Sequence, residues 1–140
     1  MDWKLELVVL PVSDVDRAKA FYAEQAGFTV DVDVSAGADF RVVQLTPPGS
    51  ACSVALMRND DARGSVQGLH LIVEDIEAAR DELANRGTTV SDFFHYDAGG
   101  QKPGLHPERG SPSRSSRSAT RTATAGWSRR WARAPAAIRP

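Results

Sequence analysis

The first part of the chain consists mostly of short runs of apolar residues separated by turn signals. LELVVLPV (5–12) is apolar almost throughout, which is typical of a strand covered on both faces. FTVDVDV alternates polar and apolar residues, and FRVVQLT and ACSVALM are two further strand-like runs joined by the turn PPGS. The pattern therefore predicts one strand, a connecting segment and then three strands.

The connecting segment, SDVDRAKAFYAEQAG, has the period of a helix rather than of a strand. Ser13 or Asp14 can accept hydrogen bonds from the N–H groups of the first turn, and Gly27 provides a stop signal. One helical face carries the apolar residues Val15, Ala18 and Tyr22. The order predicted for the first part of the chain is βαβββ.

From residue 66 the same pattern begins again. VQGLHLIV is predicted as a strand, EDIEAARDELANRG as a capped helix and TTVSDFFHY as a strand. Asp14 matches Asp75 at an offset of 61, and Gly27 matches Gly87 at an offset of 60. The apolar face also recurs at the first offset, in Ile76, Ala79 and Leu83. The two helices thus share a capping residue, an apolar face and a glycine stop, which indicates an internal duplication. The two modules span 4–58 and 66–110 and belong to one domain, 1–110.

The second module ends without its last two strands. DAGGQKPGLHPERG is expected to form a loop, suited to act as a flexible lid, and residues 111–140 then lack any strand period. That tail holds seven of the 17 basic residues and no acidic residue, so 1–110 keeps ten basic against 18 acidic residues. A run of Arg, Ser, Thr and Ala with little to bury is predicted to be disordered.

The remaining composition indicates a cytoplasmic protein. Cys52 is the single cysteine and cannot form an internal disulfide, which fits a reducing compartment. No run approaches the 18 or so apolar residues of a membrane span, and the N-terminus lacks the features of a signal peptide. We expect no membrane partner.

The order of strand, VSDVDRAKAFY and AGF, together with GLHLIVEDIEAARDELANRGTTVSDFFHYDAGG, resembles the vicinal oxygen chelate superfamily (the glyoxalase, bleomycin-resistance and extradiol dioxygenase fold) in its glyoxalase-like subgroup. The resemblance covers residues 4 to about 110. It implies an α+β fold, in which two βαβββ modules form a cup-shaped mixed sheet, here with the second module lacking its last hairpin. It also implies a homodimer.

The resemblance suggests an origin for the tail. Members commonly end the second module with a hairpin of the form SFSDPDGNGW, followed by a strand that contains Glu. SRSATRTATAGWSRRW, back-translated with permitted codons and read one base earlier, is compatible with SFSDPDGNGWLEQEV. We therefore expect a shift of reading frame near residues 110–113.

Enzymes of this superfamily hold a divalent metal through a side chain in the first strand of each module. The corresponding positions are Leu7 and Gly68, which offer no ligand atom. No metal or other cofactor is therefore predicted, and no catalytic residue is assigned. His70 and His95 remain the weak candidates for a makeshift metal pair or a general base. His106 is expected to be a loop residue that borders the cup.

The predicted ligand site is the lining of the cup. Strand alternation places His70 on the same side as Gly68, and Phe94 could stack on an aromatic ligand. The lining residues are predicted to be Leu7, Val9, Gly68, His70, Phe94 and His95.

Three function classes follow from these features. The leading one is a glyoxalase/bleomycin-resistance-like protein that binds a small, largely apolar organic molecule in the cup. The alternatives are a divalent-metal-dependent lyase or dioxygenase that uses His70 and His95, and nucleic-acid binding through the basic tail. The tail has no helical stripe and no base-reading element, so nucleic acid is not expected as a partner.

Overall fold

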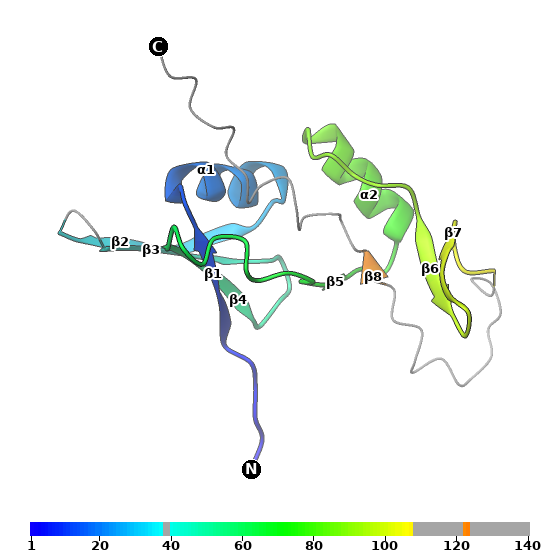
Figure 1. The fold of residues 1–140 in the computed structure, drawn as a ribbon, viewed down its shortest axis with the longest axis horizontal. Helices are drawn as coiled ribbons and strands as arrows, with labels where there is room; N and C mark the ends of the chain where they lie inside the picture. Colours follow the sequence, from blue (N-terminus) through cyan, green and yellow to red (C-terminus); the bar gives the residue numbers. More distant parts are fainter. Residues whose placement is uncertain (38–39, 108–121, 124–140) are drawn as a thin grey trace.

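The computed structural model describes residues 1–37, 40–107 and 122–123. The predicted tail, 111–140, therefore lies outside the described residues except for the backbone of 122–123. The first module contains β1 (Leu7–Val12), α1 (Val15–Ala20), the π-helical turn η1 (Phe21–Gln25), β2 (Thr29–Ala36), β3 (Phe40–Thr46) and β4 (Ser53–Arg58). The second contains β5 (Leu71–Ile72), α2 (Ile76–Asn85), β6 (Phe94–Asp97) and β7 (Gly100–Pro103), and β8 (Thr122–Ala123) follows (Figure 1).

The predicted helix starts are confirmed in both modules. Asp14 caps α1, because its Oδ1 atom accepts a hydrogen bond from the backbone N–H of Arg17 at 2.9 Å. Asp75 caps α2 in the same way and accepts from two backbone N–H groups at 3.0 Å. The paired stops are also alike, since Gly27 and Gly87 have φ angles of 75° and 83°, which favour glycine.

The four strands of the first module form one mixed sheet in the order β1-β4-β3-β2. β1 is parallel to β4, with Val9 opposite Ala55, and the other neighbouring strands are antiparallel. α1 covers one face of this sheet (Figure 1). The α+β class and the βαβββ order expected for this module are confirmed.

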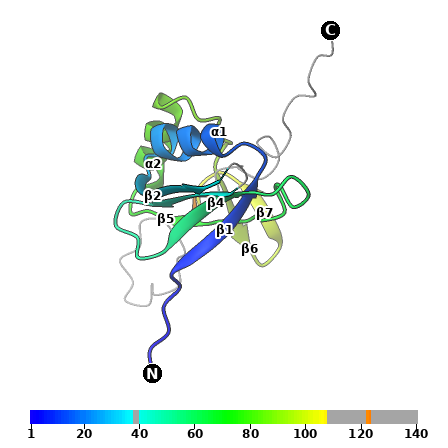
Figure 2. The same ribbon diagram turned by 90° about the vertical axis from the view of Figure 1, so that its left-hand side faces the viewer.

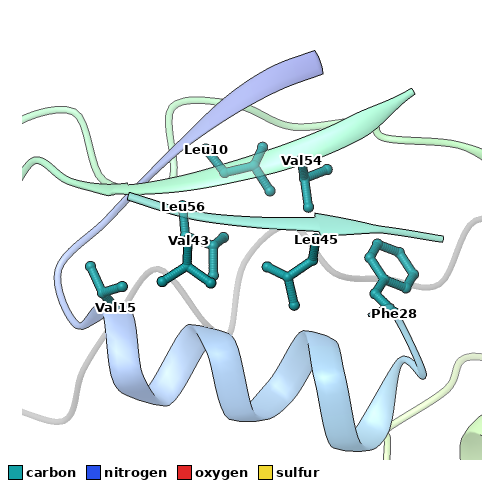
Figure 3. Close-up of a cluster of buried hydrophobic side chains, with 7 residues drawn as sticks. All are labelled: Leu10, Val15, Phe28, Val43, Leu45, Val54 and Leu56. Carbon is teal, nitrogen blue, oxygen red and sulfur yellow. The ribbon is translucent and has the colours of Figure 1, made fainter. Parts of the chain in front are cut away.

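The hydrophobic core lies between the sheet and α1. Val43, Leu45 and Leu56 are fully buried there, because alternate residues of β3 and β4 point toward the helix. Leu10, Val15, Phe28 and Val54 complete the cluster (Figure 3). The apolar helical face predicted from Val15, Ala18 and Tyr22 packs on it as expected.

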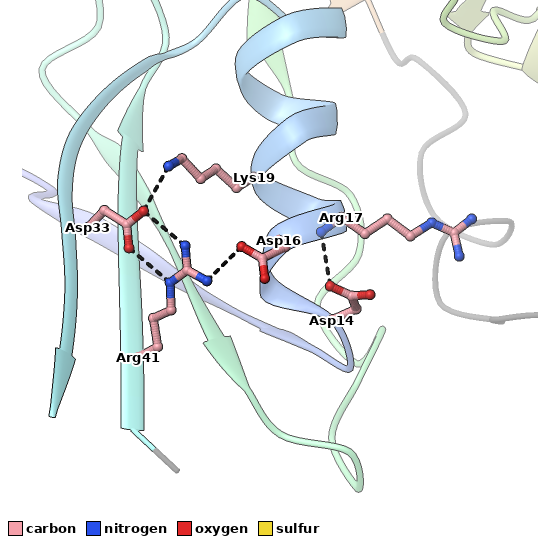
Figure 4. A network of polar contacts seen from close by, with 6 residues as sticks. All are labelled: Asp14, Asp16, Arg17, Lys19, Asp33 and Arg41. Carbon is pink, nitrogen blue, oxygen red and sulfur yellow. Dashed lines mark hydrogen bonds and ion pairs between the residues drawn. The ribbon is translucent and has the colours of Figure 1, made fainter. Parts of the chain in front are cut away.

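A network of charged side chains joins α1 to the sheet beside the core (Figure 4). Arg41 of β3 donates to both carboxylate oxygens of Asp33 on β2, and its third nitrogen donates to Asp16 of α1 at 2.6 Å. Lys19 of α1 donates to Asp33 at 2.7 Å. Hydrogen bonds from Arg41 and Lys19 hold the pKa of the Asp33 carboxyl well below its usual range.

The second module has shorter strands than its sequence predicts. Of VQGLHLIV only Leu71–Ile72 is a strand, paired with β8, and of TTVSDFFHY only the last three residues, 94–96, lie in β6. DAGGQKP, predicted as a loop or lid, instead forms the turn and second strand of the hairpin β6–β7. Ile76, Ala79 and Leu83 of α2 are only half-buried, because no wide sheet underlies this helix in the described part of the chain.

The two modules touch where their helices end. A Cβ atom added at Gly27 would collide with the guanidinium of Arg86, which follows α2. Leu69 and Leu71 also pack against the core of the first module. Both helices lie on the same side of the strands (Figures 1 and 2).

Candidate ligand-binding face

The face of the four-stranded sheet opposite α1 is the candidate site, and we call it the open face. Register and strand alternation arrange its side chains in rows that cross the sheet. One row runs through Val34, Val42, Met57 and Pro11, and the next through Val32, Gln44, Ala55 and Val9. Leu7 and Ser53 belong to a third row, and Phe40 lies at the end of β3 on the same side.

Large apolar side chains on the open face are exposed. The exposed fractions are 36% for Leu7, 44% for Val9, 37% for Val32, 51% for Val34 and 48% for Phe40. The same strands bury Val43, Leu45 and Leu56 completely on the face that α1 covers. Leu7 and Val9 lie on one edge strand of the sheet and Val32 and Val34 on the other, whereas Ser53 and Ala55 of β4 between them are buried, with exposed fractions of 6% and 3%. Exposed apolar side chains gathered on one face of a small domain are typical of a binding site.

A line of polar side chains crosses the open face between the apolar ones, and we call it the polar strip. Gln44 Nε2 donates to Ser53 Oγ at 3.2 Å, and Ser53 Oγ lies 2.7 Å from Thr46 Oγ1. Thr46 Oγ1 in turn donates to Oδ2 of Asp31. Asp31 sits at the bulge of β2, between Val30 and Val32, where the pairing register shifts.

The direction of every hydrogen bond in the polar strip follows from Asp31. An ionised carboxylate only accepts, so Thr46 uses its one hydroxyl proton on Asp31 and must accept from Ser53. Ser53 then has no proton left for Gln44, so Gln44 can contact it only through its NH₂ group. The strip therefore runs in one direction and leaves the Gln44 carbonyl oxygen as an acceptor for a bound molecule.

The six predicted lining residues lie in different parts of the structure. Leu7 and Val9 lie on the open face. Gly68 and His70 are exposed and precede β5, whereas Phe94 and His95 are half-buried in β6. Phe94 stacks edge-on against Tyr96, with ring centroids 5.8 Å apart.

The histidine that lies beside His95 is His106, not His70. The ring centroids of His95 and His106 are 5.1 Å apart, with an interplanar angle of 74°. His95 Nδ1 also lies 2.9 Å from the backbone oxygen of Gly104. Among the described residues, no three His, Cys, Asp or Glu side chains gather as metal ligands.

Sequence reasoning missed the polar strip, although its signal was present. Thr46 and Gln44 are two residues apart in β3, and Ser53 opens β4, so alternation puts all three opposite the buried Leu45. The sequence predicts that His106 borders the cup, and its contact with His95 depends on the hairpin β6–β7, where the sequence predicts a loop.

Comparison with solved structures identifies several similar chains. TnmS3, described as an antibiotic binding protein from Streptomyces sp. CB03234, is 34% identical, with a TM-score of 0.55 over 64% of this chain and 74% of its own. A glyoxalase/bleomycin resistance protein from the same organism is 35% identical, with a TM-score of 0.54 over 62% and 77% of the two chains. A superfamily member from Sphaerobacter thermophilus DSM 20745 is 30% identical, with a TM-score of 0.58 over 71% and 83%.

No curated protein sequence matches the chain significantly. In the parts of the chain that the structure describes, no helix has the length and apolar character needed to cross a membrane. Residues 4–101 match the family described as Glyoxalase/Bleomycin resistance protein/Dioxygenase superfamily, which covers most of the chain. Taken with the βαβββ module and the similar structures, this match shows that the chain belongs to the Glyoxalase/Bleomycin resistance protein/Dioxygenase superfamily.

Proposed function

We propose that this protein binds a small, largely apolar organic molecule on the open face of the sheet β1-β4-β3-β2. The observation that carries the proposal is the set of exposed apolar side chains on this face together with the polar strip, which lies where β3 ends and β4 begins. Sites for small organic molecules combine apolar walls with a few placed polar groups, and the open face has this composition. The description of TnmS3 as an antibiotic binding protein supports the same class of ligand.

The polar strip indicates which part of the ligand it would contact. The hydroxyl protons of Ser53 and Thr46 are committed within the strip, so neither hydroxyl donates outward. The Gln44 carbonyl oxygen is the acceptor that remains. A ligand with an apolar body and one hydroxyl or amine donor would therefore fit the face, with the donor placed over Gln44.

The apolar face can be tested with anilinonaphthalene sulfonate, whose fluorescence rises in apolar sites. The test variant is Val34→Asp, which places a charge on the open face, and the matched control is Ile72→Asp, at an exposed position on β5 outside that face. We expect saturable binding that weakens at least about tenfold in Val34→Asp and is unchanged in Ile72→Asp, because a carboxylate resists burial under an apolar ligand. Equal binding by both variants would contradict the proposal.

We also propose that the protein is a cytoplasmic homodimer. β1 is an edge strand, and Trp3 and Leu5 just before it are 88% and 66% exposed, on the alternation that continues into Leu7 and Val9. Such a strand edge with an apolar stripe favours pairing with a second chain. Light scattering on the purified chain should give twice the monomer mass, and a monomer at all concentrations would overturn this proposal.

The proposed compartment rests on the cysteine: Cys52 is a free thiol, which fits a reducing compartment.

A further inference from the structure

The hairpin β6–β7 brings together two imidazoles that are eleven positions apart in the sequence. His95 pairs with Lys102 across the hairpin, and the chain bends at Gly104 and Leu105, just after β7. The backbone N–H of Gly104 donates to the oxygen of Phe93 at 2.7 Å, which extends the pairing of the hairpin by one residue, and Gly104 has a φ of 84° at the bend. His106 thereby comes beside His95, with ring centroids 5.1 Å apart.

The contact with Gly104 fixes the tautomer of His95. A backbone carbonyl can only accept, so the 2.9 Å contact requires the proton on Nδ1 of His95. In the neutral ring the Nε2 atom then carries a lone pair. An Nδ1–H donated to a backbone carbonyl is the arrangement that commonly orients histidines which bind metal through Nε2.

We propose that His95 and His106 form a two-imidazole binding site for a divalent transition metal of the zinc class. Two imidazoles on one tetrahedral zinc, with Zn–N bonds of about 2.0–2.1 Å, have ring centroids about 5 Å apart. The observed separation of 5.1 Å agrees with this geometry. The site is separate from the open face, so it does not rest on the proposed function.

The chemistry of the two donors limits which metals fit. Imidazole nitrogen suits zinc, copper and nickel, whereas magnesium and calcium require oxygen ligands. Only two ligands come from the described residues, so water or an external donor would complete the coordination. His95 is half-buried and His106 is exposed, which leaves the metal open to exchange and to such a donor.

The experiment is a calorimetric titration of the full-length chain, prepared without a histidine tag, with zinc ion alone at pH 7.5. We expect one zinc per chain, and a loss of affinity of at least about tenfold in both His95→Ala and His106→Ala. His70→Ala is the matched control, since His70 is an exposed histidine outside the pair, and it should bind zinc like the unchanged chain. Magnesium should give no saturable heat.

Three results would overturn the proposal. They are no saturable zinc binding by the unchanged chain, zinc affinity retained in His106→Ala, or an equal loss of affinity in His70→Ala. Circular dichroism of each variant separates loss of the ligand from loss of the fold. If a variant proves unfolded, His95→Gln and His106→Gln replace it, because glutamine is polar and of similar size but lacks the imidazole.

Discussion

Arg41 of β3 and Asp33 of β2 are diagonal neighbours on the paired strands, and the guanidinium donates to both carboxylate oxygens at 2.9 and 3.0 Å (Figure 4). Lys19 and Asp16 of α1 extend this pair, so the charged network connects the helix to the edge of the sheet. The paired geometry and the two cations explain why the pKa of Asp33 lies well below its ordinary value.

This relationship predicts a pH-dependent contribution of Asp33 to stability. Because its pKa is lower in the folded protein than in the unfolded chain, the contribution is present above about pH 4 and is lost as the pH falls further. Asp33→Asn should have a lower free energy of unfolding than the unchanged protein at pH 7. The difference between the two free energies should be smaller at pH 3. Urea denaturation at both pH values checks this. The control is Asp60→Asn, which removes an exposed ion pair with Arg58 and should change the free energy of unfolding little at either pH. A loss of stability in Asp33→Asn that is the same at both pH values would contradict the account.

A second prediction concerns Tyr22, which packs between Phe21 and Phe28 with ring centroids 5.2 and 5.5 Å away. Burial raises the pKa of Tyr22 to about 12. Above pH 10 the unfolded chain therefore ionises first, and the free energy of unfolding should fall by up to about 1.4 kcal/mol per pH unit until about pH 12.

Two variants check the Tyr22 assignment. Tyr22→Phe should flatten the fall in stability between pH 10 and 12, whereas Tyr96→Phe, at a position 66% exposed, should leave it unchanged. The measurement is chemical denaturation across this pH range. An equally steep fall in Tyr22→Phe would show that another group causes the alkaline loss.

The two faces of the sheet should respond differently to the loss of a leucine. Leu45 is fully buried under α1, so Leu45→Ala should lower the free energy of unfolding by about 2–5 kcal/mol. Leu7 is 36% exposed on the open face, and Leu7→Ala should cost on the order of 1 kcal/mol. Denaturant titration of both variants tests this ordering, and equal losses would mean that the open face is covered in the folded protein.

The tail gives a prediction about the gene rather than the fold. We propose that the reading frame shifts near residues 110–113, so the protein made from its gene should differ from the 15.1 kDa of this sequence. Its C-terminal peptides should contain DPDGNGW. Intact-mass and peptide mass spectrometry test this, and a mass of 15.1 kDa with the Arg-rich peptides present would refute the shift.

The features predicted correctly from the sequence are those that depend on neighbouring residues. Helix capping by Asp14 and Asp75 and the alternation of β3 depend on residues close in sequence. These features can therefore be predicted without knowing which other segments pack nearby. Strand length in the second module depends on a partner strand, and β5 extends only over its two residues paired with β8. For this reason a periodic run such as VQGLHLIV was predicted to be longer than it is.

The candidate site was predicted only in part. The sequence predicts that Leu7 and Val9 share one face, because they alternate on a strand, and the register of β1 with β4 places them on the open face. The polar strip needed the cross-strand pairing of β3 with β4, and the His95–His106 pair needed a hairpin that was read as a loop. Contacts between strands depend on the tertiary structure, so they are harder to predict from a single sequence than helix caps or turns.

The most direct test of the ligand-binding face is a pair of amide NMR spectra recorded with and without anilinonaphthalene sulfonate. The account predicts that shifts concentrate in the four strands β1, β2, β3 and β4, at positions that include Val9, Val34 and Gln44, while α2 and the hairpin β6–β7 change little. Shifts confined to α2 or the hairpin, or no shifts at all, would contradict the claim that the open face binds small apolar molecules.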